Sequence, residues 1–488
     1  MDSSEYETIK GKIIVGVFAL TTRTFLLQII TAASNLILAA ILSPDVFGTY
    51  FITTAFIGFL GYFSDVGLSA ALIQKKEEPT LSELRSAFTV QQLLVGALVV
   101  IGLLLTPLLG KWYNLDNSGL FLFQAFLISF FLSSLKTIPS LLLERKLAFQ
   151  VLIIPQLLET VLYNGVAIVL ALKGFGVISF AWAALARGIG GLVSIYIISP
   201  WNIGLELSFE SIKHLLTYGI PMQVNSILAL IKDNLITLFL GRILPLRDVG
   251  YIGWAKNMAE LILRLIMDSV IRVTFPAYSR LQHDYIVLGK AIEKSLFFLA
   301  YFIFPVTALS CLFINPLIHI IPKYLKWEPA LFSFYLFSFA SVWACFSTPV
   351  VNALNAIRKV NYTLILMLLW TSMTWIFVPL FVHLFGYNGV AINAALIAVT
   401  GAIPLVLLKR FVAYSIIKPL LKPFFSTLVI IIPFVSIIPQ PTSIISMVII
   451  LSAYGILYLS ISAIWMNREL GPYVNIILRK MKLRFVSV

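Results

Sequence analysis

The sequence has 488 residues, of which 60% are hydrophobic and 11% are charged, and its mean hydropathy is +0.98. Because a soluble domain carries roughly 25% charged residues, this composition excludes a soluble globular protein. The formal net charge is +14, but the basic residues form neither a stripe nor a folded nucleic-acid-binding module, so we expect no nucleic-acid partner.

Apolar segments punctuated by Pro, Gly and charged residues recur along the whole chain. A helix that crosses a bilayer needs about 20 mostly apolar residues, and the first segment is too long to be the apolar core of a cleaved signal peptide. The pattern predicts an all-α integral membrane protein with about fourteen transmembrane helices. The predicted spans are 13–42, 46–72, 87–110, 118–141, 151–172, 176–199, 217–241, 251–275, 295–321, 331–356, 361–384, 389–408, 423–439 and 443–466.

Lysines and arginines are distributed unevenly between the two sides of these spans. The connectors on the side of the N-terminus, with Lys136 counted among them, hold 24, and the opposite connectors hold six. By the positive-inside rule, both termini are cytoplasmic, which predicts a multi-pass protein of the cytoplasmic (inner) membrane. Residues 205–218 and 473–485 mix apolar and charged side chains, which is typical of connectors lying at the membrane surface.

An internal repeat links the two halves of the chain. Leu42 and Gly48, in the turn after the first span, recur as Leu244 and Gly250 at an offset of 202. Polar residues of the preceding spans keep the same register and fall on one face of each helix; the pairs are Thr24 with Ser226, Thr31 with Asp233 and Asn35 with Thr237. A second, weaker match relates 174–177 to 387–390.

The repeat predicts how the chain is divided. Each unit holds six helices, an even number, so both begin on the same side and form parallel repeats about an axis along the membrane normal. We expect a first bundle at 1–202, an interfacial linker and second bundle at 203–410, and an extra helix pair with a basic tail at 411–488. Two similar halves allow alternating access in transporters, although duplication also occurs in membrane proteins that transport nothing.

Ten ionisable residues fall inside the predicted spans. A charge at the centre of a membrane helix costs about 2.5–3.5 kcal/mol on insertion scales, so these side chains are expected to pair with one another or to line a wet cavity. The basic members are Arg23, Arg187, Lys232, Lys256 and Arg264, and the acidic members are Asp65, Glu159, Asp233, Glu260 and Asp268.

Five charges of alternating sign recur every four residues in the span 251–275 and just beyond it: Lys256, Glu260, Arg264, Asp268 and Arg272. This spacing stacks them along one helix face. The ladder either neutralises itself or contributes to a binding site, and the sequence leaves both readings open. Lys232 and Asp233 are adjacent in the chain, which also allows local neutralisation.

Arg23 and Arg187 have no acidic residue nearby in sequence, so each needs a partner from elsewhere, and Asp65 or Glu159 can supply it. Residues 187–191 read Arg-Gly-Ile-Gly-Gly, which predicts close approach of another backbone. Fixed guanidinium groups suit an anionic head group such as pyrophosphate. The buried acids are candidates for ion or proton coupling.

Motifs for catalysis and cofactor binding are missing from the sequence. There is no Walker loop, zinc-protease motif, Cys-x-x-Cys or nucleophile elbow, and Cys311 and Cys345 give no metal-ligand spacing. We expect neither catalytic residues, nor a metal, nor a cofactor. A membrane glycosyl polymerase or ligase, the enzyme alternative, is expected to have a large extracytoplasmic loop, whereas the outer connectors here are short.

Several short motifs, in this order and spacing, resemble those of the polysaccharide transporter family: lipid-linked oligosaccharide or O-antigen flippases of the multidrug/oligosaccharidyl-lipid/polysaccharide exporter superfamily. The motifs are residues 42–48 (LSPDVFG), 65–68 (DVGL), 143–149 (LERKLAF), 174–177 (GFGV) and 275–280 (FPAYSR). Ile178 and Tyr278 depart from the residues expected there, which leaves the subfamily open.

The resemblance implies a non-enzymatic flippase that moves a polyprenyl-pyrophosphate-linked oligosaccharide for polysaccharide or lipopolysaccharide export. It implies two bundles in a V, a cationic cavity for the head group and a polyprenyl tail that stays in membrane lipid. Arg23 and Arg187 are the first expected head-group contacts, followed by Lys232, Lys256 and Arg264; Asp65, Asp233, Asp268 and Glu159 are the expected sites of Na⁺ or H⁺ coupling. Polysaccharide assembly proteins are possible partners. A multidrug or small-metabolite antiporter of the same fold is the main alternative.

Overall fold

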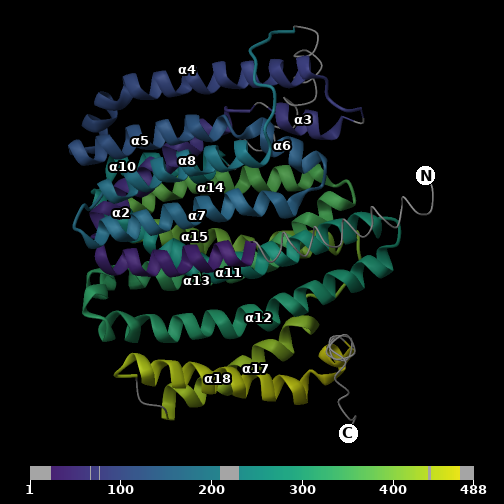
Figure 1. Cartoon of the computed structure of the whole chain (residues 1–488). Coiled ribbons are helices and arrows are strands. Elements are labelled where there is room, and N and C mark those ends of the chain that lie inside the picture. Colours follow the sequence, from purple (N-terminus) through teal and green to yellow (C-terminus); the bar gives the residue numbers. More distant parts are fainter. Residues whose placement is uncertain (1–23, 66, 76, 209–229, 438–440, 473–488) are drawn as a thin grey trace. The chain divides into compact units, whose positions relative to one another are not determined.

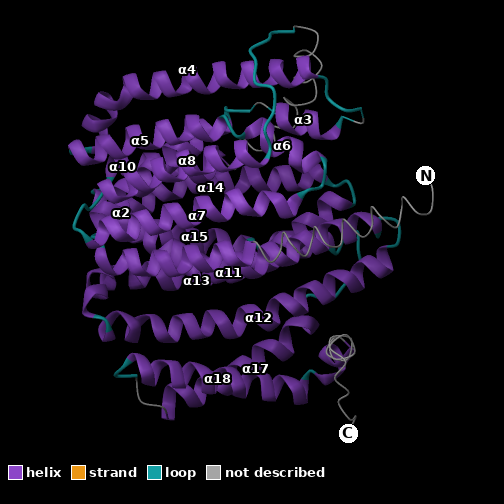
Figure 2. Ribbon diagram, in the orientation of Figure 1, coloured by secondary structure: helices purple, strands orange, loops and turns teal. Residues whose placement is uncertain are grey.

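The computed structural model describes residues 24–65, 67–75, 77–208, 230–437 and 441–472. Within these ranges the regular secondary structure is helical and no strand occurs (Figures 1 and 2). The predicted all-α class is confirmed.

The helices overlap the predicted spans. The first described helix covers Thr24–Ile41. The others are α2 (Pro44–Tyr62), α3 (Leu68–Gln74), α4 (Leu81–Tyr113), α5 (Asn117–Ser134), α6 (Thr137–Arg145), α7 (Phe149–Leu172), α8 (Ile178–Ile198), η1 (Ile231–Leu235), α10 (Ile236–Ile243), α11 (Leu246–Arg280), α12 (Tyr285–Ile320), η2 (Pro322–Ala330), α13 (Leu331–Ala356), α14 (Val360–Phe385), α15 (Asn388–Thr400), α16 (Ala402–Leu408), α17 (Ile417–Ile437) and α18 (Ile444–Trp465). Of these, α4, α12 and α17 begin earlier than predicted.

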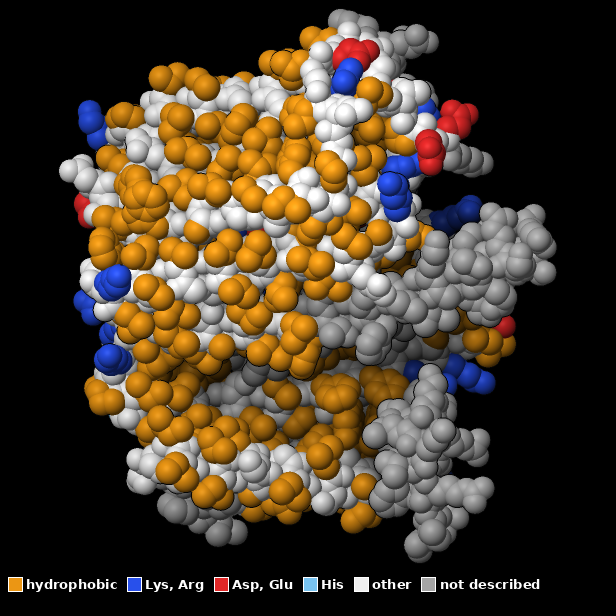
Figure 3. Space-filling view, in the orientation of Figure 1, with side chains coloured by type: hydrophobic (Ala, Val, Ile, Leu, Met, Phe, Trp, Pro, Cys, Tyr) orange, Lys and Arg blue, Asp and Glu red, His pale blue; other side chains and the backbone are white. Residues whose placement is uncertain are grey.

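Among the described residues, eleven helical segments are long and apolar enough to cross a membrane. Figure 3 shows hydrophobic side chains over most of the visible surface of the helices, with lysine and arginine gathered mainly near helix ends. Exposed Leu104, Ile197 and Ile464 are each at least 75% accessible, which is costly in water but favourable in lipid. The protein is a multi-pass membrane protein.

Local sequence signals explain where several helices begin and end. Thr80 and Glu83 form a reciprocal capping box at the start of α4, and Asn114 ends that helix in the left-handed conformation, with φ of 50°. The predicted span 46–72 is interrupted between α2 and α3, where Gly67 adopts a φ of 78°. The predicted span 118–141 is also divided, because α5 ends at Ser134 and α6 begins at Thr137.

The chain forms two compact units. Unit one comprises Met1–Trp254 and Met367–Gly389, and unit two comprises Ala255–Leu366 and Val390–Val488, each in so far as its residues are described. The division into bundles at 202 and 410 stays a prediction.

The internal repeat is visible in the packing of unit one. A Cβ added to Gly48 would lie 1.8 Å from the carbonyl oxygen of Leu246, and a Cβ added to Gly250 would lie 2.0 Å from that of Pro44. In the register of the repeat, Leu246 corresponds to Pro44 and Gly250 corresponds to Gly48, so the two contacts are equivalent. Such reciprocal contacts are what a two-fold relation between repeats produces.

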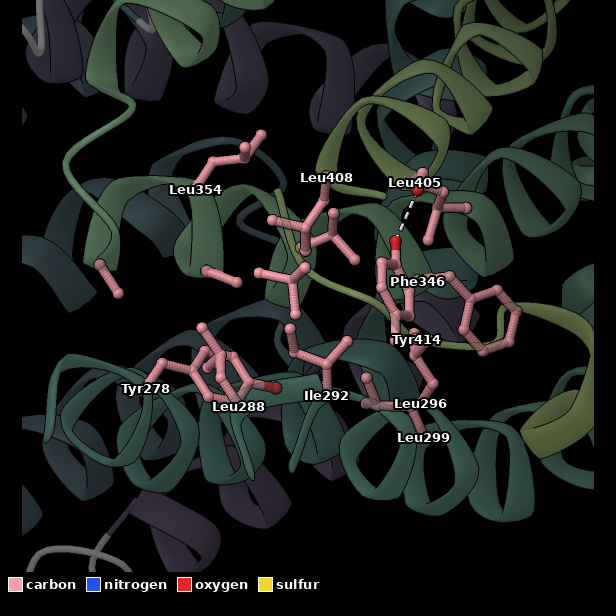
Figure 4. Close-up of a cluster of buried hydrophobic side chains, with 14 of the residues drawn as sticks. Tyr278, Leu288, Ile292, Leu296, Leu299, Phe346, Leu354, Leu405, Leu408 and Tyr414 are labelled. Atoms are coloured by element: carbon pink, nitrogen blue, oxygen red, sulfur yellow. Dashed lines mark hydrogen bonds between the residues drawn. The ribbon is translucent and has the colours of Figure 1, made fainter. Parts of the chain in front are cut away.

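The core of unit two joins α11, α12, α13 and α16 to the chain segment that leads into α17 (Figure 4). Tyr278 of α11 donates a hydrogen bond to Ser295 of α12 at 2.7 Å, and Tyr414 donates one to the Leu405 carbonyl at 2.5 Å. Leu288 and Leu296 are fully buried between them. This cluster fixes the start of α12 beside the start of α17.

The first of the two expected surface connectors is described only to residue 208. Residues 201–208 are not helical, and they contact the first turns of α4. The Glu206 backbone N–H donates to Thr89 at 3.0 Å, and the Ser208 N–H donates to Ser86 at 3.0 Å. The described part of the connector therefore packs on protein. The other connector, 473–485, lies outside the described residues.

Candidate functional site

Unit one contains a cavity of about 500 Å³ lined by several helices. We call it the unit-one cavity. Hydroxyl, amide and charged side chains contribute much of its wall, which is unusual for the interior of a membrane protein. Its lining residues are Leu27, Ser69, Ile73, Ser133, Lys136, Thr137, Ser140, Leu141, Glu144, Leu152, Pro155, Gln156, Glu159, Thr160, Arg187 and Ile195.

Three charged residues of the lining form one cluster, which we call the Glu159 cluster. The Lys136 Nζ lies 2.6 Å from Glu159 Oε1, and the Arg187 Nε lies 3.5 Å from Glu159 Oε2. The Lys136 and Glu159 side chains are 12% and 13% exposed, whereas Arg187 is 56% exposed. The lysine and the carboxylate therefore neutralise each other, and the guanidinium keeps a large accessible surface.

The backbone around the cluster explains its geometry. Lys136 lies in the break between α5 and α6. Gln156, Glu159 and Thr160 lie on one face of α7, at spacings of three and four residues. A Cβ at Gly191 would lie 2.2 Å from Glu159 Oε1, so a glycine on α8 makes room for the carboxylate. The glycines after Arg187 were expected to admit another backbone, but Gly188, Gly190 and Gly191 face side chains instead.

Asp65 forms local hydrogen bonds at the start of α3. Its carboxylate accepts hydrogen bonds from the Ser69 hydroxyl at 2.8 Å and from the Ser69 backbone N–H at 3.2 Å. It forms no ion pair with an arginine among the described residues. Asp65 therefore fixes the start of α3, and Ser69, rather than Asp65, lines the unit-one cavity.

Lys232 and Asp233 form a local pair, as their adjacency in the sequence allows. The Lys232 Nζ lies 3.6 Å from Asp233 Oδ1, and both side chains are at least one-third exposed. They belong to η1, a π-helical turn. Trp375 of α14 donates its indole N–H to the Ile231 carbonyl at 3.2 Å.

Part of the charge ladder on α11 neutralises itself in unit two. Glu260 accepts from Arg264 Nη2 at 2.6 Å, and its other oxygen lies 3.9 Å from the Lys256 Nζ. The side chains of Asp268 and Arg272 lie outside the description, and so does Arg23 as a whole.

The structure thus brings Arg187 and Glu159 together, as the sequence suggested, and adds Lys136, which was assigned to a cytoplasmic connector. The predicted span 118–141 contains Lys136, so its place inside a span was a signal available in the sequence. Gln156 was also missed. Its Oε1 is buried without a hydrogen-bond partner among the described residues.

Comparison with known proteins identifies the chain's relatives. A family model described as polysaccharide biosynthesis protein matches residues 37–331. The chain belongs to this family. It is 25% identical over 265 residues to the succinoglycan biosynthesis transport protein ExoT of Rhizobium meliloti (strain 1021), covering 54% of this chain and 52% of that protein. It is 26% identical over 294 residues to an uncharacterized membrane protein in the cps region of Klebsiella pneumoniae, covering 58% of this chain and 59% of that protein.

The chain thus spans a little over half the length of these two relatives. Among solved structures, the fold is similar to the lipid II flippase MurJ in its inward closed conformation, with a TM-score of 0.73, 16% identity and coverage of 92% of this chain and 99% of that chain. An inward-facing multidrug resistance MATE family transporter of the MOP superfamily gives a TM-score of 0.58 at 18% identity, with 81% and 100% coverage. The chain therefore has the fold of these two solved structures.

Proposed function

We propose that this protein is a flippase that moves a polyprenyl-pyrophosphate-linked oligosaccharide across the cytoplasmic membrane by alternating access, for polysaccharide export. The observation that carries the proposal is the polar unit-one cavity, with the exposed guanidinium of Arg187 in its wall. The polysaccharide biosynthesis family and the similarity to ExoT, a succinoglycan biosynthesis transport protein, support this class of cargo.

Arg187 has the geometry for contact with a pyrophosphate. Glu159 faces its Nε, so the two terminal Nη groups, which make no hydrogen bond with described residues, remain available for a bidentate contact with phosphate oxygens. The hydroxyl groups of Ser140 and Thr160 line the same cavity and suit hydrogen bonding to sugar hydroxyls. Arg23, Lys232, Lys256 and Arg264 remain proposed as further head-group contacts.

The coupling of transport to an ion is a second part of the proposal. Glu159 is best placed among the candidates, because it contacts the proposed head-group arginine directly. Protonation of Glu159 or binding of Na⁺ there would weaken its attraction for Arg187 and change the affinity of Arg187 for phosphate. Asp65, Asp233 and Asp268 remain proposed as alternatives. Both termini are proposed to be cytoplasmic, and polysaccharide assembly proteins are proposed partners.

One observation favours a second function, that of a multidrug or small-metabolite antiporter. The described lining of the unit-one cavity holds two carboxylates, Glu144 and Glu159, against the two cations Lys136 and Arg187. A cavity without net positive charge also suits organic cations. A catalytic role as a glycosyl polymerase or ligase is the less supported alternative, since the lining provides no recognised catalytic motif.

The proposal is tested with the full chain in proteoliposomes. The probe is a fluorescent polyprenyl-pyrophosphate-linked oligosaccharide, and its movement is followed by its exposure to a membrane-impermeant quencher. We expect Arg23→Ala and Arg187→Ala to abolish protein-dependent movement while insertion stays normal, and Lys173→Ala, an exposed cation outside the cavity, to behave as the wild type. Unchanged movement of the probe in both arginine variants would show that Arg23 and Arg187 are not the head-group contacts. Transport of organic cations without movement of the probe would favour the antiporter.

A further inference from the structure

Unit two holds a second cavity, of about 420 Å³, at one end of α12, α17 and α18. We call it the basic pocket. None of its lining residues belongs to the unit-one cavity. Its wall carries five cations, two carboxylates and an apolar floor; the residues are Lys290, Glu293, Lys294, Phe297, Phe298, Lys418, Pro419, Lys422, Arg468, Glu469 and Pro472.

One oxygen of each carboxylate has a partner, whereas Glu469 Oε2 has no hydrogen-bond partner among the described residues. Glu293 Oε1 accepts from the Ser415 backbone N–H at 2.6 Å, just before α17 begins, and Glu469 Oε1 pairs with the Lys422 Nζ at 2.7 Å. The side chains of the four other cations make no hydrogen bond or ion pair with described residues. These cations are Lys290, Lys294, Lys418 and Arg468.

The frame of the pocket is fixed by packing. Lys290 and Lys294 are one turn apart on α12, which the core cluster of Figure 4 joins to the segment before α17. Phe297 belongs to a second buried cluster, which includes Tyr454 of α18 and Met466 just after it. Because like charges repel at short range, cations held here by packed helices favour an anionic ligand that spreads its charge among them.

The surroundings of the pocket point to a lipid as the source of that anion. Next to the pocket residues of α17, Ile417 and Leu421 are 66% and 43% exposed, as expected of side chains that contact acyl chains. Trp465, which ends α18 three residues before Arg468, is 48% exposed, and exposed tryptophans are enriched at the head-group level of membranes. The pocket cations belong to connectors predicted to be cytoplasmic, where anionic lipids attract basic side chains.

We propose that the basic pocket binds the phosphate head group of an anionic glycerophospholipid of the cytoplasmic leaflet. Lys290, Lys294, Lys418 and Arg468 contact the phosphate, and Phe297 and Phe298 underlie the glycerol and the first acyl carbons. The bound lipid joins the start of α12 to the α17–α18 pair. This inference is independent of the transported cargo.

The test measures lipid binding rather than transport. The full chain is purified in detergent, and binding of dioleoyl phosphatidylglycerol is titrated by native mass spectrometry, with dioleoyl phosphatidylcholine as the comparison lipid. We expect the double variant Lys294→Gln/Lys418→Gln to lose about tenfold or more in affinity for its tightest-bound phosphatidylglycerol, because each cation removed eliminates a charge-assisted contact.

A matched control removes the same charge elsewhere in unit two. Lys409→Gln/Arg410→Gln alters two cations on the same predicted side but outside the pocket, and its affinity is expected to equal that of the wild type. Equal losses in both double variants, or no loss in either, would overturn the site. Equal binding of phosphatidylcholine would overturn the requirement for an anionic head group.

The last arm distinguishes a lipid from a soluble phosphate. Inorganic phosphate at millimolar concentration is added to the protein with phosphatidylglycerol bound. We expect the lipid to remain bound, because its acyl chains contribute to the affinity. Displacement of the lipid by phosphate, sensitive to the same pocket substitutions, would overturn the lipid as the ligand. Melting temperatures of both double variants, measured without lipid, verify that they are folded.

Discussion

The reciprocal glycine contacts of unit one give a sharp prediction for Gly48→Ala and Gly250→Ala. An added methyl group would lie 1.8 Å from the Leu246 carbonyl oxygen in the first variant and 2.0 Å from the Pro44 oxygen in the second, whereas ordinary contacts begin at 3.4 Å. The obstructing atoms belong to backbone, so no side-chain rotation can relieve the overlap. The two backbone segments would have to move apart before either methyl group could fit.

The expected cost follows from this displacement. Overpacking of a tight contact typically destabilises a protein by about 1–3 kcal/mol, which exceeds the gain of about 0.5–1 kcal/mol from replacing a helical glycine by alanine. We expect each single variant to lower the free energy of unfolding. The double variant is expected to cost less than the sum, because one separation of the segments relieves both overlaps.

Two other helical glycines provide matched controls. Nothing lies within 4 Å of a Cβ at Gly96 of α4 or Gly165 of α7, so Gly96→Ala and Gly165→Ala are expected to be neutral or slightly stabilising. The assay is denaturant unfolding of the detergent-purified full chain, followed by circular dichroism. If Gly48→Ala and Gly250→Ala are as stable as the controls, the close approach of the starts of α2 and α11 is wrong.

Three further predictions concern the Glu159 cluster and the end of α3. A double-mutant cycle of Lys136→Met and Glu159→Gln should give a coupling of about 1.5–3 kcal/mol in the same unfolding assay, because the pair is charge-assisted and mostly buried; additive effects would contradict the 2.6 Å contact. Gly191→Ala should displace Glu159 and reduce protein-dependent flipping, whereas normal flipping would show that the carboxylate position is unimportant. Arg145→Gln should destabilise the end of α3, since Arg145 donates to the carbonyls of Leu72, Ile73, Lys75 and Glu77, and faster proteolysis there is the measurement; an unchanged cleavage rate would contradict this capping role.

Much of the fold follows from sequence because hydrophobic length and local turn signals are local properties. The boundaries of α7, α8 and α14 lie within two residues of the predicted spans. The repeat was also readable from the sequence, since Gly48 and Gly250 are small residues at matching positions, near the starts of α2 and α11. The sequence pattern does not show why glycine is needed at these two positions. The reason is a close backbone contact between segments that are far apart in the sequence.

The candidate site was only partly predictable. Arg187 and Glu159 are 28 positions apart, and the energetic cost of charge within a membrane indicated that an acid and a base in predicted spans would pair. Lys136 was missed because it was counted with the cytoplasmic connectors, although the predicted span 118–141 contains it. In the structure it lies in the break between α5 and α6 and lines the cavity. The ladder contacts of Lys256, Glu260 and Arg264 followed from four-residue spacing, because such neighbours meet within a single helix.

The most direct test of the central claim asks whether the sugar-pyrophosphate head enters the unit-one cavity. Ser140→Cys, in a chain whose Cys311 and Cys345 are replaced by alanine, places a thiol in the cavity wall, and Lys173→Cys places one outside it. The rate of modification by a polar maleimide is measured with and without a polyprenyl-pyrophosphate-linked oligosaccharide. The account predicts that the lipid-linked sugar slows modification at position 140 but not at 173, and that Arg187→Ala abolishes this protection. Equal modification rates at position 140 with and without the lipid-linked sugar would contradict it.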